Sequence, residues 1–241
     1  MPDFLIAYCG PAALPENLWV RWNTDPLLIA VLAAVAALIV SGRSADARAG
    51  WGAGVLMVMV FVSPLCALSS ALFSARVFHH VVLVAAVAPL LARAFPLRPL
   101  GYPPLAMVVA THAVILWLWH APGPYAWGLA SVPAYWLMQL SLLGSAWLMW
   151  RAIMAPAESS GPALMALVAT IGQMGLLGAV IVFAPVPLYP VHLASTTPWG
   201  LTPLADQQLA GLLMWVPAML PYLAVGLYTA WASLRHSEPA L

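Results

Sequence analysis

Apolar segments of roughly 20 residues recur along the whole chain, and segments of that length are typical of transmembrane helices. Proline, glycine and serine cluster between the segments and mark where each helix is expected to end. The first segment is short and the last is long, which allows these two helices to be tilted or broken. The pattern predicts seven spans, at about 26–42, 51–72, 76–95, 103–120, 132–154, 162–184 and 205–234.

The composition agrees with a chain that is embedded in a membrane. Of the 241 residues, 64% are hydrophobic and 6% are charged, whereas soluble proteins are about 25% charged. We therefore expect an all-α integral membrane protein, a polytopic bundle of about seven transmembrane helices. No linker or internal repeat divides it, so residues 1–241 are predicted to form one domain: an outer N-terminal segment (1–25), the bundle (26–234) and a cytoplasmic tail (235–241).

The arginines predict the orientation of the bundle, because short cytoplasmic loops are enriched in basic residues. Six arginines follow the spans of odd number: Arg43, Arg48, Arg93, Arg98, Arg151 and Arg235. The intervening loops are expected to hold only Arg76, and the N-terminal segment adds Arg21. This distribution predicts an outer N-terminus and a cytoplasmic C-terminus.

Histidines gather in the half of the bundle that is predicted to face outward. His79 and His80 begin the third span, and His120 ends the fourth. His112 lies about 12 Å deeper than His120 by helix rise. This asymmetry indicates chemistry at the outer side of the membrane.

The donor atoms expected near His80 and His112 suit a soft metal ion. Cys66 in the second span and Met214 in the seventh fall at a comparable depth. Imidazole, thiolate and thioether groups favour Cu(I), so the functional interpretation is a transient copper site. The structural alternative is that His112 hydrogen-bonds a neighbouring helix and Cys66 packs as a small apolar side chain. Cys9 and Cys66 are too few and too dissimilar in setting to predict a disulfide framework.

Polar residues at the start of the last apolar segment form a second candidate site. Asp206, Gln207 and Gln208 stand where a lipid-facing sequence would be apolar, and ionisable groups near hydrocarbon are costly. The alternative is local, since Thr202-Pro203 is typical of a helix start and a carboxylate in the first turn favours the helix dipole. The preceding residues 185–203 are too rich in proline for a helix.

Several other activities are disfavoured by the sequence. No HExxH zinc-protease helix, phosphate-binding glycine loop or pair of buried carboxylates occurs. A permease would need polar residues across the membrane midplane, and the inner half offers almost no titratable groups. We therefore expect a protein that is not an enzyme.

Three segments resemble the CtaG-type family of integral cytochrome c oxidase assembly factors, over roughly residues 50–230. The strongest match is the closing one. It runs from Leu188-Tyr189-Pro190 through Gly200-Leu-Thr-Pro-Leu-Ala-Asp-Gln-Gln-Leu-Ala-Gly211 to Met214-Trp-Val-Pro217. The Trp117-Leu-Trp-His-Ala-Pro122 junction and the entry to the third span, Phe73-Ser-Ala through His80, are also similar to the family pattern.

The resemblance implies an inner-membrane protein of bacteria that helps to assemble a haem–copper oxidase. Its partners would be cytochrome c oxidase subunits and a periplasmic copper chaperone, and its transient cofactor would be Cu(I). His80 and His120 are the ligand positions that the resemblance transfers, while His112 is inferred from depth alone. Asp206 would support the site or contact the partner, as would Gln207, Tyr189 and His79.

One departure from the family weakens the transfer of copper ligands. The family tends to carry a His-x-x-x-His pair at the start of the third span, and here Arg76 occupies the first position and His80 the second. The fifth span, where relatives often have further histidines, has none. Two alternatives therefore stay open, a structural or haem-binding subunit of a respiratory complex and a metal or small-molecule permease.

Overall fold

The computed structural model describes residues 8–96, 101–155 and 160–237, and its regular elements there are helices without a strand. The helices are α1 (Pro26–Val40), α2 (Ala47–Met57), α3 (Leu65–Ala71), α4 (Phe73–Val82), α5 (Ala88–Ala94), α6 (Leu105–His120), α7 (Pro122–Leu129), α8 (Val132–Ile153), α9 (Gly161–Phe183), α10 (Pro203–Trp215) and α11 (Leu220–Ser237). These bounds lie within a few residues of the predicted segments, and α7 is an additional helix that hydropathy did not predict.

Side-chain caps explain where several helices begin. Asp25 precedes α1 and accepts hydrogen bonds from the backbone N–H groups of residues 27 and 28, while Asp46 caps α2 in the same way at residue 49. Ser131 caps α8, and Thr202 caps α10 with Pro203 at its first position. These side chains satisfy N–H groups that have no partner inside the helix. The predicted helix start at Thr202-Pro203 is confirmed.

Prolines bend the chain twice, because proline cannot donate the backbone hydrogen bond that would continue a helix. The π-helical residues Val58–Val62 extend α2, and α3 continues beyond Pro64 at an angle of 46°. α7 follows α6 beyond Ala121-Pro122 at an angle of 76°. A second π-helical segment, Leu83–Val87, joins α4 to α5 within one continuous helical span.

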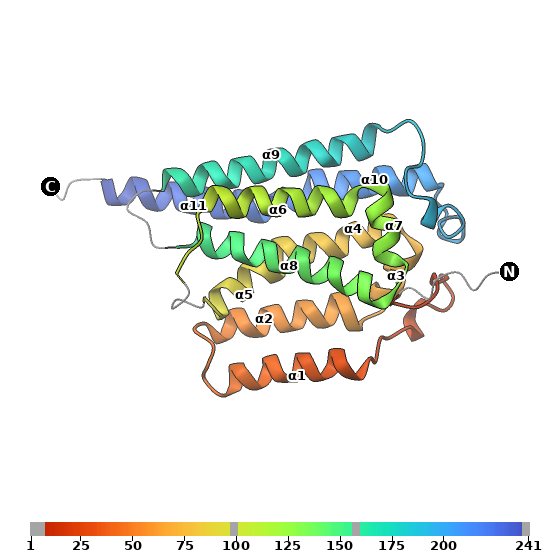
Figure 1. Cartoon of the computed structure of the whole chain (residues 1–241), viewed down its shortest axis with the longest axis horizontal. Helices are drawn as coiled ribbons and strands as arrows, with labels where there is room; N and C mark the ends of the chain where they lie inside the picture. The colour runs from red at the N-terminus through yellow and green to blue at the C-terminus, as the bar shows by residue number, and fades with distance from the viewer. Residues whose placement is uncertain (1–7, 97–100, 156–159, 238–241) are drawn as a thin grey trace.

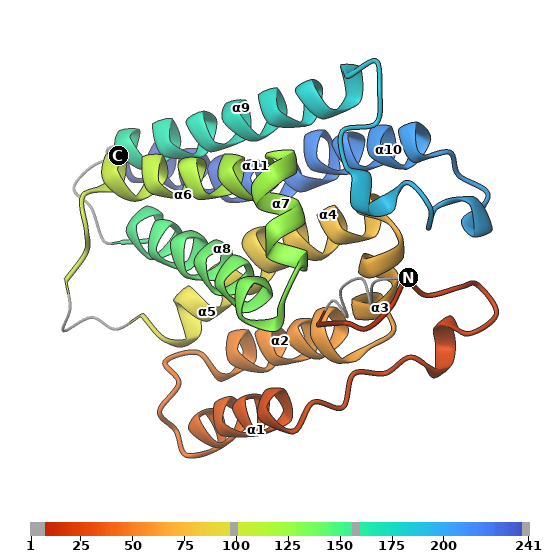
Figure 2. The same cartoon turned by 45° about the vertical axis from the view of Figure 1, so that its right-hand side comes forward.

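The helices form a bundle with its connections at two ends (Figure 1). α9 packs against α10 and α6, α6 against α8, and α5 against α8 and α2. α1 lies at the edge of the bundle beside α2 (Figure 2). We call the end that carries α3, α7 and residues 184–202 the α7 end, and α7 lies across it in both views.

The apolar helices support a membrane protein, and the number of spans stays a prediction. Within the described residues, three helical stretches are long and apolar enough to cross a membrane, and the number rises to five if each bent pair is one span. The three are Phe73–Ala94, Gly161–Phe183 and Pro203–Arg235, and α1 is a shorter apolar helix. The connection between α1 and α2 and the ends of α5, α8 and α11 lie together, opposite the α7 end (Figure 1). This grouping agrees with the arginine pattern, and the orientation stays a prediction.

The placement of Arg76 in a loop is wrong. Arg76 lies inside α4 and is fully buried, so it cannot contribute to the charge of an outer loop. Helix α3 and residue Leu72 bring the chain into α4 earlier than hydropathy alone indicated. The charged side chain lowered the local hydropathy and displaced the predicted start of the third span.

The expectation that the cysteines stay unpaired is also wrong. Cys9 and Cys66 form a disulfide, with their Cα atoms 5.2 Å apart and a sequence separation of 57. The N-terminal segment folds back over α3, which sequence patterns did not predict. Disulfides persist in oxidising compartments, so this bond is consistent with the predicted outer location of the N-terminal segment.

Helices α9 and α10 approach each other closely at two glycines. A Cβ atom built on Gly211 would lie 2.6 Å from Cγ2 of Val182 and 2.7 Å from the carbonyl oxygen of Gly178. Small residues at such contacts allow helices in membranes to pack backbone against backbone.

We predict that Gly211→Ala destabilises the bundle by about 1–3 kcal/mol, the usual cost of overpacking a close contact. Gly172→Ala is the matched control on α9, because no other atom lies within 4 Å of its Cβ position. Thermal unfolding of the purified protein in detergent measures both. Equal midpoints for the two variants would contradict close packing at Gly211.

A buried histidine and arginine cluster as the candidate functional site

Helix α4 carries three nitrogen-rich side chains within about one turn, and all of them are buried. Arg76 and His79 have no exposed surface, and His80 is 1% exposed. The helix packs against α3 and α10, so these side chains lie inside the bundle. Buried ionisable groups are rare and mark candidate functional sites.

Asp206 fixes the start of this helix. One carboxylate oxygen accepts the backbone N–H of Phe73 at 2.7 Å, and the other accepts the N–H of Ser74 at 3.2 Å and also its hydroxyl. The carboxylate thus satisfies N–H groups at the N-terminus of α4, where negative charge is favourable. The local alternative from the sequence was that Asp206 serves the first turn of its own helix, and the structure shows its carboxylate bonded to the start of a different helix, α4.

His120 presents a free ring nitrogen. Its Nδ1 lies 2.7 Å from the carbonyl oxygen of Leu116, and since a carbonyl only accepts, Nδ1 carries the proton. The Nε2 lone pair then has no partner among the described residues. The hydroxyl of Tyr189 donates to the backbone carbonyl of His120 at 2.7 Å. Tyr189 is therefore a positioning residue for the predicted ligand His120.

His80 and His120 meet in the bundle. Their ring centroids are 5.5 Å apart and their planes are nearly perpendicular. Nε2 of His80 lies 3.3 Å from the side-chain nitrogen of Gln139 on α8. Nδ1 of His80 and the amide oxygen of Gln139 have no partner in the described part of the chain. An amide turned by 180° would accept from Nε2–H and leave Nδ1 as a free lone pair.

Arg76 adds an uncompensated positive charge to the cluster. None of its three guanidinium nitrogens has a hydrogen-bond partner within the described residues. The guanidinium carbon lies 5.2 Å from the ring centroid of Tyr135, a cation–π contact. A buried, unpaired charge is strongly destabilising, so this arrangement costs the fold free energy.

The other predicted residues lie in different surroundings. His112 donates from Nδ1 to the hydroxyl of Ser145, 3.0 Å away, and none of the described ring contacts joins it to another histidine. His79 packs its ring edgewise on Phe61 and has no hydrogen-bond partner in the described region. The structure therefore shows the hydrogen bond to a neighbouring helix that the structural alternative expects, and Nε2 of His112 has no partner within the described residues.

Gln207 holds residues 184–202 against the helices by hydrogen bonds. Its side-chain oxygen accepts the backbone N–H of Leu188, and its nitrogen donates to the carbonyls of Ile181 and Val186. Gln207 therefore joins α10 to the end of α9 and to the proline-rich segment. Like Asp206, it supports the cluster without contacting a histidine ring.

A second buried pair was not among the predicted site residues. His192 is nearly fully buried, and its Nδ1 donates to the carbonyl of Ala71 at 3.2 Å. Its Nε2 consequently accepts the hydroxyl of Tyr125 at 2.7 Å, which fixes the neutral tautomer. Burial, with a smaller contribution from the charge of Arg76, lowers the pKa of His192 to about 4.

Sequence reasoning also missed Gln139 and Tyr135 as members of the cluster. Both interrupt the fifth apolar segment, and a polar side chain in the interior of such a segment was the available signal. Both side chains contact the cluster from α8.

The donor set is small for a metal ion. Within the described residues, no group of three or more His, Cys, Asp and Glu side chains is arranged to hold one. The pair His80 and His120 offers two imidazoles in a site without water-exposed surface. Such a pair suits an ion that accepts few, soft ligands, and the nearby charge of Arg76 weakens its hold on any cation.

Removal of the Asp206 carboxylate is expected to destabilise the protein more than removal of an ordinary cap. Substituting a helix cap costs about 0.5–2 kcal/mol, and we predict that Asp206→Ala reaches or exceeds the upper end because two buried N–H groups lose their acceptor. Thr202→Ala is the matched control, since it removes one cap bond from α10. Thermal unfolding in detergent compares the two, and a smaller loss for Asp206→Ala would contradict the capping role.

Acid is expected to destabilise the α7 end through His192. The unfolded side chain titrates near 6.5 and the folded one near 4, so the unfolded state binds more protons between these values. Stability is therefore complete above pH 6.5 and falls as the pH drops toward 4, by at most about 1.4 kcal/mol per unit for one group. We predict that His192→Gln flattens this dependence in unfolding experiments between pH 4 and 7. A dependence unchanged by the substitution would assign it to other groups.

Of three comparisons with known proteins, one gives a match. The sequence model of the family described as cytochrome c oxidase caa3 assembly factor matches residues 32–236, most of the chain. No curated protein and no solved structure shows significant similarity to this chain. The matched region contains α2 to α10 and with them the whole histidine and arginine cluster. The chain therefore belongs to the family of cytochrome c oxidase caa3 assembly factors.

Proposed function

We propose that this assembly factor assists the insertion of copper into its oxidase and that His80 and His120 hold Cu(I) in transit. The observation that carries the proposal is the pair of buried imidazoles, 5.5 Å apart between ring centroids and each with a ring nitrogen that has no protein partner in the described part of the chain. Imidazole is a common copper ligand, and Cu(I) accepts a low coordination number.

The surroundings support a site that is held ready for a ligand. The proton on Nδ1 of His120 fixes the tautomer in which the Nε2 lone pair is free to bind a ligand. The hydroxyl of Tyr189 positions His120 by donating to its backbone carbonyl. Asp206 positions the start of the helix that carries His80. Supporting hydrogen bonds of this kind orient metal ligands and tune their basicity.

The charge of Arg76 favours a relay over storage. A guanidinium close to the histidines repels a cation, which lowers affinity and speeds release. A protein that passes copper to an oxidase subunit must release it, so weak binding by two imidazoles fits the task. The donor would be a copper chaperone at the predicted outer side of the bacterial inner membrane, and the acceptor a subunit of the oxidase.

A second function is favoured by the same arginine. A protein that holds an oxidase subunit receptive while copper enters needs no metal ligand of its own. Arg76 could then serve the packing of α4 against Tyr135, and the histidines would be polar groups inside the bundle. This scaffolding role is the alternative that the experiment must separate from copper transfer.

We predict that the oxidase from a strain lacking this protein has a normal haem content and at least several-fold less copper than the oxidase from the wild-type strain. Wild type and His112→Ala should restore the copper, whereas His80→Ala and His120→Ala should not, because only the last two remove members of the pair. The measurement is metal analysis and haem spectroscopy of the isolated oxidase, with the amount of each variant in the membrane determined in parallel.

Each other outcome identifies a different role. Full restoration by His80→Ala and His120→Ala would show scaffolding without metal binding. A visible haem band in the purified assembly factor would favour the haem-binding alternative. An oxidase of normal copper content in the absence of the protein would overturn copper insertion as its function.

A further inference from the structure

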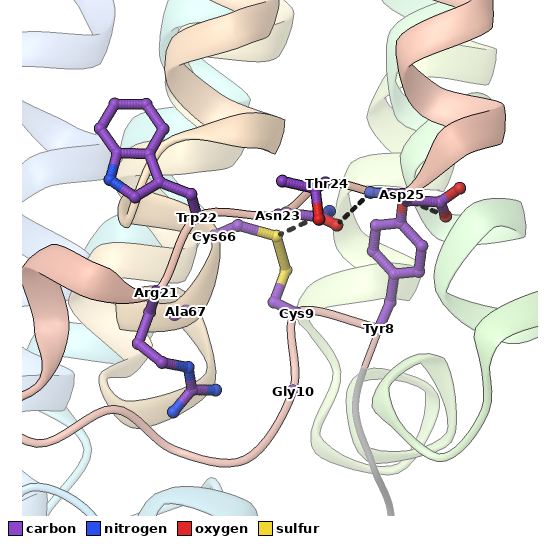
Figure 3. Close-up of a pocket in the computed structure, with 10 residues that line it drawn as sticks. All are labelled: Tyr8, Cys9, Gly10, Arg21, Trp22, Asn23, Thr24, Asp25, Cys66 and Ala67. Carbon is purple, nitrogen blue, oxygen red and sulfur yellow. Dashed lines mark hydrogen bonds between the residues drawn. A yellow bond between two sulfur atoms is a disulfide. The ribbon is translucent and has the colours of Figure 1, made fainter.

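The disulfide forms part of the wall of a surface pocket outside the histidine cluster. The pocket has a volume of about 360 Å³ and lies between the N-terminal segment, the residues before α1 and the start of α3 (Figure 3). Cys9 and Cys66 line it together with Tyr8, Arg21 and Asn23. Both sulfur atoms thus border a cavity that a partner can enter.

The two sulfurs differ in accessibility. Cys9 is 8% exposed and lies on the N-terminal segment, whereas Cys66 is 1% exposed and lies in α3. In thiol–disulfide exchange, the sulfur that the incoming thiolate can reach is the one that is attacked. Cys9 is therefore the expected point of attack, and Cys66 the leaving group.

Polar groups of the pocket favour this direction of exchange. The guanidinium of Arg21 donates to the carbonyl of Pro11, and a Cβ atom on Gly10 would lie 2.7 Å from its Nη2. The cation therefore lies against the residue that follows Cys9, where it attracts the incoming thiolate toward this sulfur. The side-chain nitrogen of Asn23 lies 3.9 Å from Sγ of Cys66 and donates to the sulfur that leaves.

The disulfide also borders the buried cluster. The hydroxyl of Tyr135 lies 3.6 Å from Sγ of Cys9, and the ring of the same tyrosine makes a cation–π contact with the guanidinium of Arg76. Arg76 precedes His80 by four residues on α4, which places them on one face of the helix. Tyr135 and Arg76 thus connect the disulfide to the helix face that carries His80.

We infer that the Cys9–Cys66 disulfide is exchangeable and that its reduced form is an entry site for Cu(I). The reductant is a protein dithiol. One of its thiolates attacks Sγ of Cys9, the Cys9–Cys66 bond breaks, and Cys66 leaves as a thiolate that takes up a proton. The second thiol of the partner then resolves the mixed disulfide and releases Cys9. Two electrons pass to the cysteines, and the partner becomes a disulfide.

Copper binding follows from the chemistry of the reduced pair. Thiolates select Cu(I) among biological cations. Binding displaces one proton from each thiol, and the sulfurs must separate to about 4.6 Å, twice the ~2.3 Å of a zinc–thiolate bond. The inference rests on the proposed function for the identity of the metal, whereas its donor atoms are distinct from His80 and His120.

The first test measures copper on the full-length protein in detergent. Oxidised protein and protein reduced with a phosphine, then desalted without oxygen, are titrated with Cu(I) against a chromophoric chelator. We expect reduction to add one Cu(I) per chain with thiolate-to-copper absorption. The variant Cys9→Ser/Cys66→Ser should bind equally little at this site after either treatment. No gain on reduction of the wild type would overturn the inference.

The same titration separates this inference from the proposed function. His80→Ala/His120→Ala should retain the copper that depends on reduction and lose any copper bound by the oxidised protein. If the double alanine variant retains the reduction-dependent copper and its oxidised form binds as much copper as oxidised wild type, the histidine site is excluded and the cysteine site is supported. If the double serine variant does not fold, alkylation of the reduced wild type must abolish the additional copper, and copper that survives alkylation overturns the inference.

The second test measures exchange with reduced thioredoxin as the protein dithiol. Two thiols per chain should become reactive toward a maleimide. Arg21→Gln should slow their appearance by roughly three- to tenfold, because it removes the cation next to Cys9 that attracts the incoming thiolate. A disulfide that resists thioredoxin in the folded protein would be structural only and would overturn the inference.

Discussion

The carboxylate of Asp206 joins two helices whose contacting residues are more than 130 positions apart, and the candidate site depends on that contact. It accepts the free N–H groups at the start of α4, and it does so from the first turn of α10. The interaction therefore fixes where α4 begins and which way it faces. Arg76, His79 and His80 all lie within the next two turns of this helix. Without the cap, the orientation of all three side chains would be free to change.

The cluster that results is costly for the fold. Ring nitrogens of four histidines and the whole guanidinium of Arg76 have no protein partner within the described residues. Unsatisfied buried polar groups cost about 1–3 kcal/mol each, and a bundle that served only as a structural element would have no reason to retain them. Under the proposed function, the unpaired nitrogen atoms of His80 and His120 would hold the copper in transit. The positive charge beside them limits how tightly a cation is held, which suits transfer.

The α7 end covers this cluster by bringing distant segments together. The N-terminal segment is tied to α3 by the disulfide, and the indole of Trp199 donates to the carbonyl of Ala13 in the same segment. His192 in the proline-rich segment bonds both the end of α3 and Tyr125 of α7. The proline-rich segment was predicted correctly not to form a long helix, yet it is folded onto the bundle and buries the side chains of His192 and Thr196. A pocket remains where the N-terminal segment crosses α3.

The sequence by itself determined the helical segments and the family. Apolar length, prolines and helix caps are local properties, so they predicted the helix bounds to within a few residues, and the motif around Asp206 indicated the family that the sequence model confirmed. Only the tertiary structure decided that Cys9 pairs with Cys66, that Asp206 caps a helix other than its own, and that His80 meets His120. These contacts join segments far apart in the chain. In a membrane protein, apolar surfaces look the same in sequence whether they face lipid or another helix, so the packing that creates the site leaves little trace in the hydropathy pattern.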